Sequence, residues 1–179
     1  MMKSDNDEEI SKADFFYRMT LHSYSLISKA NERLDSKIRD LIGIITAIVP
    51  LTMGVVYFTF SSLSSKLEQL PPQVPFILVV SVIFSFWFFA LAAIVAVIGY
   101  FPRDFELIDP SKLIDCYKKE NRLVILQRVS ATLASTIATN NEVCEHKAKV
   151  LKCSELFIVL GIGALVTAFS ILTFFIMII

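Results

Sequence analysis

A single charge-free stretch decides the class of this chain. Residues Leu156 to Ile179 include 24 positions in succession without a charged side chain. A helix of ~20 apolar residues is long enough to cross the hydrocarbon core of a bilayer. The stretch is therefore expected to be a transmembrane helix. The composition agrees, because 55% of the 179 residues are hydrophobic and the mean hydropathy is +0.63, which is typical of membrane proteins.

Two further stretches have the same character. Residues 41–60 and 76–101 contain no charged side chain, and the second is long enough to cross a bilayer with some tilt. The segment 61–75 between them is rich in serine and closes on prolines, which is typical of a connection and not of a binding domain. We therefore expect three transmembrane helices, at 41–60, 76–101 and 156–179.

The distribution of lysine and arginine predicts the orientation of these crossings. Seven of the 17 basic residues lie in 1–40, one lies in 61–75 and nine lie in 102–155. Short basic segments remain on the cytoplasmic side of a membrane. We expect a membrane protein with a cytoplasmic N-terminus, a cytoplasmic segment at 102–155, an external hairpin at 61–75 and a C-terminus on the outer side.

The N-terminal segment 1–40 has the pattern of an amphipathic helix. Ser11 to Asp14 resembles a capping box, and no proline or glycine follows before Gly43. Apolar or small residues then recur in steps of three or four. This predicted stripe comprises Phe16, Met19, Ser23, Leu26, Ala30, Leu34 and Ile38. One helix is expected to run from this segment into the first crossing.

The segment 102–155 also predicts helices. Asp109 followed by Pro110 is a favourable helix start. One helix from Pro110 to Glu155 would begin ~65 Å below the membrane, beyond the reach of the nine residues 102–110, so we expect a turn near Asn121. The helix after it should continue into the last crossing, with this predicted seam: Leu126, Val129, Leu133, Ile137, Asn140, Cys144, Lys147 and Leu151. The predicted fold is all-α, with three transmembrane helices and a cytoplasmic helical stalk.

The residues do not predict an enzyme. The chain has two histidines and five glycines, and it contains no nucleophile motif and no phosphate-binding glycine loop. Its three cysteines have no CxxC spacing, which disfavours a metal site. From these absences together we expect no catalytic residue, no metal site and no cofactor. The net charge of zero gives no indication of nucleic acid. The crossings contain no ionisable residue, which disfavours a proton relay or a coupled transporter.

Basic residues near the crossings allow two interpretations. They can bind lipid headgroups, as juxtamembrane clusters do. They can also form an anion site between stalk helices for a phosphate-bearing ligand, because arginine pairs with phosphate through two parallel donors. The candidate residues for that ligand site are Arg33, Asp35, Lys37, Arg103, Arg122 and Arg128. Asn140 likewise has two interpretations, either as a polar residue that sets register in the predicted seam or as part of a solvated face.

The stretch from Ala30 to Ile38, which leads into the first crossing, carries a resemblance. It contains Asp35-x-Lys37, and the chain is similar in layout to the small transmembrane effectors of the Pycsar antiphage systems and to the related SLATT effectors. In that layout a cytoplasmic helix with an Asp-x-Lys motif precedes a hydrophobic hairpin, a charged helical segment and a final crossing. The family more often has alanine on both sides of the motif, whereas this chain has Leu34 and Ile38.

The resemblance implies a mechanism. In those systems a partner cyclase makes cCMP or cUMP in response to infection, and the membrane effector then impairs the inner membrane. By this resemblance the chain would be a non-enzymatic antiphage effector of the bacterial inner membrane, with a periplasmic C-terminus. It would bind a cyclic nucleotide, have a cyclase as functional partner and assemble with identical copies in the lipid bilayer. Two alternatives remain open, namely a structural or regulatory membrane subunit that docks a protein partner, and a constitutive small channel or toxin.

Overall fold

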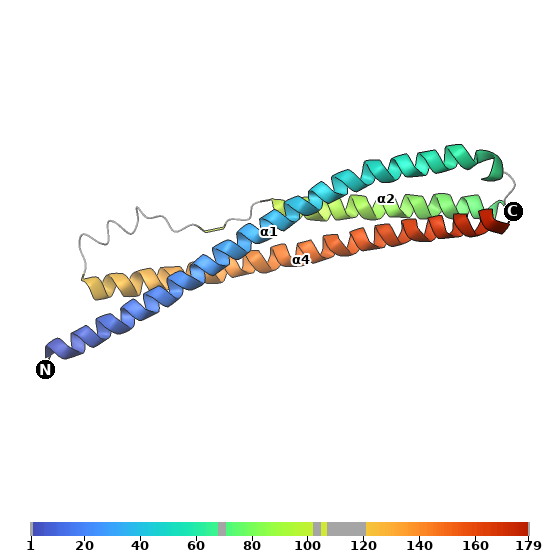
Figure 1. The fold of residues 1–179 in the computed structure, drawn as a ribbon. Coiled ribbons are helices and arrows are strands. Elements are labelled where there is room, and N and C mark those ends of the chain that lie inside the picture. Colours follow the sequence, from blue (N-terminus) through green and yellow to red (C-terminus); the bar gives the residue numbers. More distant parts are fainter. Residues whose placement is uncertain (1, 68–70, 102–104, 107–120, 179) are drawn as a thin grey trace. The chain divides into compact units, whose positions relative to one another are not determined.

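The computed structural model describes residues 2–67, 71–101, 105, 106 and 121–178, and every secondary-structure element within them is an α-helix. These helices are α1 (Met2–Leu67), α2 (Gln73–Tyr100) and α4 (Arg122–Ile178) (Figure 1). Each contains a window long and apolar enough to cross a membrane, judged by length and composition. The helical class and the three apolar helices expected from the sequence are thus confirmed.

The connection between α1 and α2 is shorter than the expected segment 61–75. Helix α1 continues to Leu67 and α2 begins at Gln73, after Pro71 and Pro72. The N–H of Val74 donates to the carbonyl of Pro71 over 2.9 Å, which forms the first turn of α2. The serines of this segment are compatible with a helix, whereas consecutive prolines are not, because each lacks an N–H group and restricts the residue before it.

Two long helices continue without interruption, as the sequence predicts. Helix α1 extends from the polar segment through the first apolar stretch, and α4 extends through the last one. Helix α4 begins beside the turn expected near Asn121, whose carbonyl accepts the N–H of Ile125 over 3.1 Å. The rest of that turn, and the predicted helix start at Asp109 and Pro110, lie outside the described residues.

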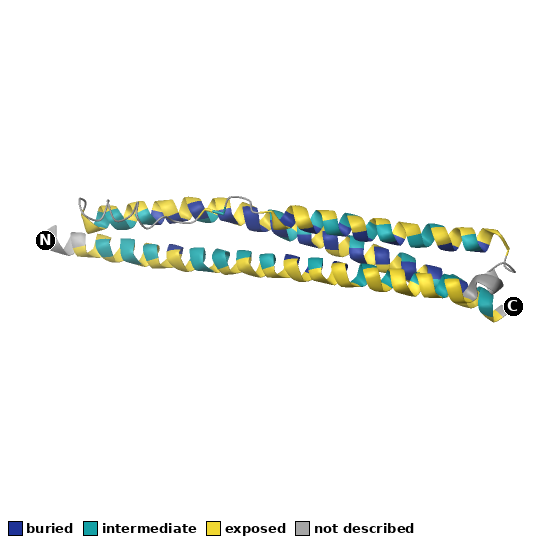
Figure 2. Ribbon diagram, turned by 90° about the horizontal axis from the view of Figure 1, so that it is seen from above, coloured by how far each residue is buried: buried dark blue, intermediate teal, exposed yellow. Residues whose placement is uncertain are grey.

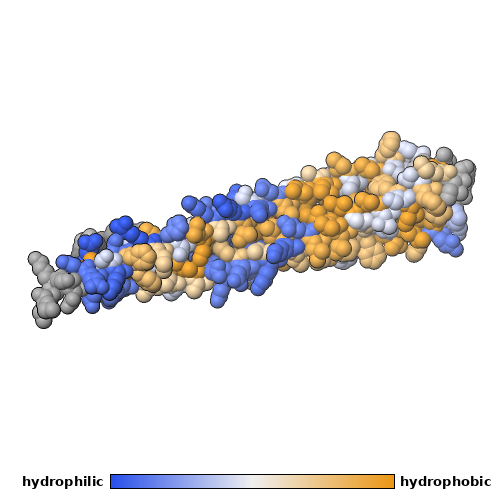
Figure 3. All heavy atoms as spheres, turned by 60° about the horizontal axis from the view of Figure 1, so that its bottom comes forward, coloured by the Kyte–Doolittle hydropathy of each residue, from blue (hydrophilic) through white to orange (hydrophobic). Residues whose placement is uncertain are grey.

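The chain divides into two compact units. Unit 1 comprises Met1–Asp35 and Pro102–Lys147, and unit 2 comprises Ser36–Phe101 and Ala148–Ile179. Hydrophilic side chains gather on the surface of unit 1, and hydrophobic side chains cover most of the visible surface of unit 2 (Figure 3).

Unit 2 is held together by close packing and by serine hydroxyls. The hydroxyl of Ser85 on α2 donates to the carbonyl of Gly161 on α4, and Ser154 on α4 donates to the carbonyl of Ala92 on α2, both over 2.7 Å. All four of these partners lie within or beside the apolar stretches. Apolar helices that gain no hydrophobic free energy by packing together usually associate through small residues and interhelical hydrogen bonds.

In unit 1 the buried side of α1 differs from the predicted stripe. Of its members, Phe16, Met19 and Leu26 are exposed, at 48%, 51% and 53%, whereas Ser23 and Leu34 are half-buried. The buried or half-buried side of α1 (Figure 2) lies further round the helix and shares only Leu34 with the stripe, at Ile10, Ala13, Tyr17, Thr20, Tyr24, Ile27, Asn31 and Leu34. On its neighbour α4 the buried side mixes polar and apolar residues, with Ser130, Thr136 and Asn140 beside Leu133 and Val143.

Candidate functional site

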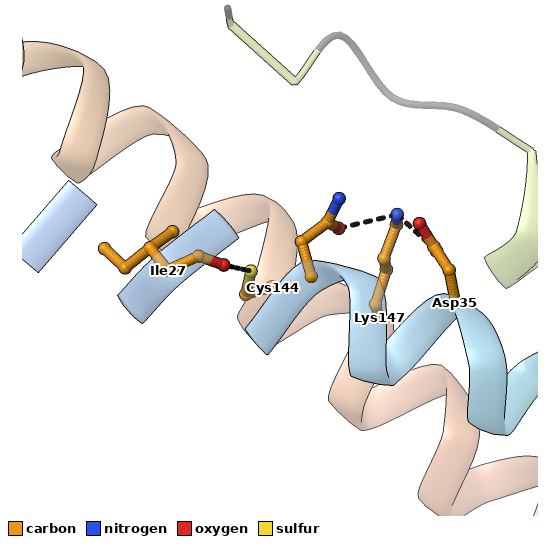
Figure 4. Close-up of polar contacts among 5 residues, drawn as sticks. Ile27, Asp35, Cys144 and Lys147 are labelled. Carbon is orange, nitrogen blue, oxygen red and sulfur yellow. Dashed lines mark hydrogen bonds and ion pairs between the residues drawn. The ribbon is translucent and has the colours of Figure 1, made fainter. Parts of the chain in front are cut away.

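A buried polar cluster links α1 to α4 in unit 1. The Nζ atom of Lys147 on α4 lies 2.6 Å from Oδ1 of Asp35 and 2.8 Å from Oδ1 of Asn31, both on α1. In Figure 4 the side chains of Lys147 and Asp35 point toward one another. The Lys147 side chain is only 6% exposed, while that of Asp35 is 30% exposed. We refer to Asn31, Asp35 and Lys147 as the lysine cluster.

The position of the two acceptors follows from helix geometry. Asn31 and Asp35 are four residues apart on α1, so their side chains lie on the same face, one turn above the other. A buried ammonium needs a counter-charge and acceptors for its N–H groups, because desolvating a charge is costly. One ammonium on α4 is therefore held by two successive turns of α1, which fixes the axial position of α4 relative to α1 within unit 1.

A second polar contact lies one heptad before Lys147. Asn140 is fully buried, and its amide forms two hydrogen bonds with the backbone of one residue: the N–H of Glu106 donates to Oδ1 over 3.0 Å, and Nδ2 donates to the carbonyl of Glu106 over 3.1 Å. Of the two interpretations of Asn140, the solvated face is therefore wrong, whereas the neighbouring Asn141 is exposed. Asn140 acts on the backbone of the segment that follows α2, and not on the side chain of another helix.

Cys144 lies beside the lysine cluster. Its Sγ atom is 3.9 Å from the carbonyl oxygen of Ile27 on α1 (Figure 4). Burial raises the pKa of the Cys144 thiol above its ordinary value, the nearby Lys147 ammonium opposes the rise, and Asp35 adds to it. The thiol is therefore neutral at physiological pH and is a poor nucleophile.

The structure separates the candidate residues predicted for a phosphate-bearing ligand. Asp35 faces Lys147, whereas Arg33 and Lys37 lie exposed on α1. Arg122 and Arg128 are exposed near the start of α4, and Arg128 lies 19 residues before Lys147, which is about 28 Å of helix. Arg103 lies outside the described residues. Asp35, Arg33 and Lys37 thus share one short stretch of α1, and the two described arginines of α4 are not brought to it.

Sequence reasoning did not identify Asn31 and Lys147 as partners of Asp35. One signal was available: Lys147 occupies an apolar seam, and a lysine at such a position requires a buried acceptor or counter-charge. The sequence alone offered several acidic residues for that role, and the choice of Asp35 depends on the register between two helices far apart in the chain.

These features define a class: an α-helical chain with three helices long and apolar enough to span a membrane, and with a polar helical unit that contains a buried lysine paired with an aspartate. Among the described residues, no group of three or more histidine, cysteine, aspartate or glutamate side chains is arranged to hold a metal ion. Comparison with protein-family models, with curated proteins and with solved structures finds no match to this chain.

Proposed function

We propose that this chain is a non-enzymatic membrane effector of bacterial antiphage defence. In this proposal a partner cyclase supplies cCMP or cUMP, the nucleotide binds the cytoplasmic helices, and the bound effector impairs the inner membrane. The three apolar helices insert as transmembrane helices, with the N-terminus in the cytoplasm and the C-terminus in the periplasm. Basic residues concentrated in 1–40 and 102–155 support this orientation.

The observation that carries the proposal is the lysine cluster. Lys147 and Asp35 connect α1 and α4, and these are the two helices that contain both polar segments and apolar stretches. A ligand that binds one packing of α1 against α4 more tightly than another shifts the population toward the first. Because the same two helices continue into apolar stretches, a change in their packing can act on the membrane without any charged group in the crossings.

The Asp35-x-Lys37 motif places two different groups on α1. Asp35 faces inward to Lys147, and Lys37 lies exposed, four residues after the exposed Arg33. Residues four apart share a helix face, so Arg33 and Lys37 form a pair of neighbouring cations. We propose that this pair attracts the phosphate of the nucleotide, since charge-assisted hydrogen bonds to phosphate are the strongest polar contacts such a surface offers.

The test measures membrane potential in cells that express the protein, with cCMP, cUMP or neither supplied by a co-expressed cyclase. Nucleotide-dependent depolarisation is expected. Arg33→Ala with Lys37→Ala should abolish the dependence, while Lys12→Ala, a change at an exposed lysine that pairs with Glu8, should retain it. The purified protein should bind the active nucleotide in equilibrium dialysis. Absence of binding together with an unchanged membrane potential would refute the proposal.

The same experiment separates the two alternatives. A constitutive channel or toxin depolarises cells to the same extent with and without nucleotide. A structural or regulatory subunit leaves the potential unchanged and co-purifies with a stoichiometric protein partner.

A further inference from the structure

Helix α1 carries a second apolar face, which none of the described residues of unit 1 covers. It comprises Phe15, Phe16, Met19 and Leu26, whose exposed fractions range from 48% to 72%. We call it the α1 outer face. It ends at the exposed cations Lys29 and Arg33, before the charge-free stretch 41–60 begins. Contiguous large apolar side chains outside a membrane span mark an interaction surface more often than an ordinary solvated one.

Helix α4 carries a face of opposite character, on the side away from its buried residues. Ala131, Ser135 and Ala138 follow one another in steps of four and three, and all three are exposed. The exposed carboxylates Glu142 and Glu145 continue the same side of the helix. We call these five residues the α4 outer face. Its small side chains allow another helix to approach closely, because the separation of packed helices depends on the side chains at the contact.

The two outer faces lie at the same level along unit 1. The lysine cluster and the Cys144 contact show that α1 and α4 run parallel, with facing residues 112, 116 and 117 positions apart. Adding a separation in this range to a residue number of α1 gives the residues of α4 at the same height along unit 1. Met19 is thus level with Ala131 and Ser135, and Leu26 is level with Ala138. The same separations set Lys29 and Arg33 level with Glu142 and Glu145. Large apolar groups are thus level with small ones, and cations are level with anions.

We infer that unit 1 binds a second copy of this chain, with the α1 outer face of one copy packed against the α4 outer face of the next. Within one copy the two faces point away from each other, because α1 and α4 pack through their opposite sides. In a ring of copies whose rotation axis runs along the helices of unit 1, equal levels meet between neighbouring copies. Each copy offers one face and receives the other, which is a heterologous contact that builds rings.

A second copy explains the two faces better than another occupant does. A lipid surface or an unrelated protein would require only the apolar residues of α1. Neither would require small residues and carboxylates at matching levels on α4. The self-assembly rests on the membrane insertion proposed above, and it does not depend on the nucleotide.

Disulfide cross-linking in isolated membranes tests this contact on the full-length chain. The background carries Cys116→Ser and Cys153→Ser and keeps the buried Cys144. Leu26→Cys combined with Ala138→Cys should give a ladder of cross-linked dimers and larger species on a non-reducing gel, without added nucleotide. A mixture of two differently tagged copies, one with each single change, should give only the tagged heterodimer. The matched control is Leu21→Cys with Ala138→Cys, because Leu21 is 44% exposed but lies two residues after Met19, on a different side of α1.

A charge swap gives an independent arm. Glu142→Lys with Glu145→Lys should abolish the ladder, and Lys29→Glu with Arg33→Glu added to the same chain should restore it. Circular dichroism of each variant establishes that the helices are intact. An absent ladder with intact helices, or a ladder equal to that of the Leu21→Cys control, would overturn the inference.

Three further outcomes would also overturn it. The first is that Leu26→Cys alone cross-links to itself as strongly as the pair does, which indicates a two-fold contact. The second is that probes carried by lipid quench a spin label at Leu26, which indicates a membrane surface. The third is that a different protein shields Leu26→Cys from maleimide, which indicates another partner. A ladder without any nucleotide response would count against the proposed ligand and leave the contact standing.

Discussion

The ammonium of Lys147 lies 2.6 Å from the carboxylate of Asp35, across 112 residues of sequence. The lysine is nearly inaccessible, and its partner retains contact with solvent on one side. Such a pair contributes little net stability compared with apolar residues of similar size, but losing one partner leaves a buried charge without compensation. The pair therefore defines which turn of α1 faces which turn of α4.

Asp35→Ala should destabilise the protein by about 3 kcal/mol, the lower end of the range for breaking a buried ion pair, because Asp35 is partly exposed. The measurement is thermal unfolding of the full-length protein in detergent. Asp40→Ala removes an exposed carboxylate from the same helix and should change the stability by less than about 0.5 kcal/mol. Asp35→Leu combined with Lys147→Met should recover most of the loss. Equal effects at Asp35 and Asp40 would show that the ion pair does not hold the helices.

Gly161→Ala should destabilise unit 2, whereas Gly163→Ala should not. A Cβ atom at Gly161 would lie 2.9 Å from the ring of Phe89, which is only 1% exposed and cannot move into open space. Overpacking of this kind costs about 1–3 kcal/mol. Gly163 has no atom within 4 Å of the corresponding position, and alanine there should be neutral or stabilise the helix by up to about 1 kcal/mol. Thermal unfolding of both variants in detergent measures the difference, and a loss at Gly163 as large as at Gly161 would contradict it.

Much of the fold follows from the sequence, because long charge-free stretches leave few choices. The three apolar helices and the start of α4 beside Asn121 are recovered from hydropathy and chain reach alone. The buried face of α1 is not recovered. Two apolar stripes follow the same helical period on this segment, and only the side chains of α4 decide which one is buried. Phe16 and Leu26 are the more hydrophobic choice, yet both are exposed, while Tyr17 is half-buried and Thr20 is buried.

The candidate site was predicted only in part for a related reason. Asp35 was identified from a local motif, but its partner Lys147 is 112 residues away and belongs to another basic cluster in the sequence. Helical periodicity specifies which face a residue occupies, and it carries no information on the axial offset between two helices. That offset is set by the contacts of Lys147 with Asn31 and Asp35, which appear only once the helices are packed.

Asn140→Ala should release the segment around Glu106. The Asn140 amide is the described partner of both the N–H and the carbonyl of Glu106. Its loss leaves both backbone groups to hydrogen-bond with water. We expect a lower free energy of unfolding by about 1 kcal/mol, and faster amide hydrogen exchange at Glu106. Asn141→Ala changes the same side chain at the adjacent exposed position and should leave the exchange at Glu106 unchanged. Unaltered exchange in Asn140→Ala would show that the two hydrogen bonds do not hold the segment.

Cys144 should resist alkylation in the folded protein, and its resistance should depend on pH in a defined direction. Burial raises the pKa of its thiol. At a fixed pH the fraction of reactive thiolate falls about tenfold for each unit by which the pKa rises. With Cys144 as the single cysteine, maleimide labelling should remain slow at neutral pH and accelerate only above the ordinary thiol range, about pH 8.5. The exposed Cys153, tested in the same way, should label readily, and both should label at once after denaturation.

Because the unfolded chain loses the Cys144 thiol proton at lower pH than the folded chain, the free energy of unfolding should be unaffected by Cys144 below about pH 8 and should fall as pH rises above about 8.5. Replacing Cys144 by alanine should remove that fall, and a fall of the same size without the thiol would assign it to another group.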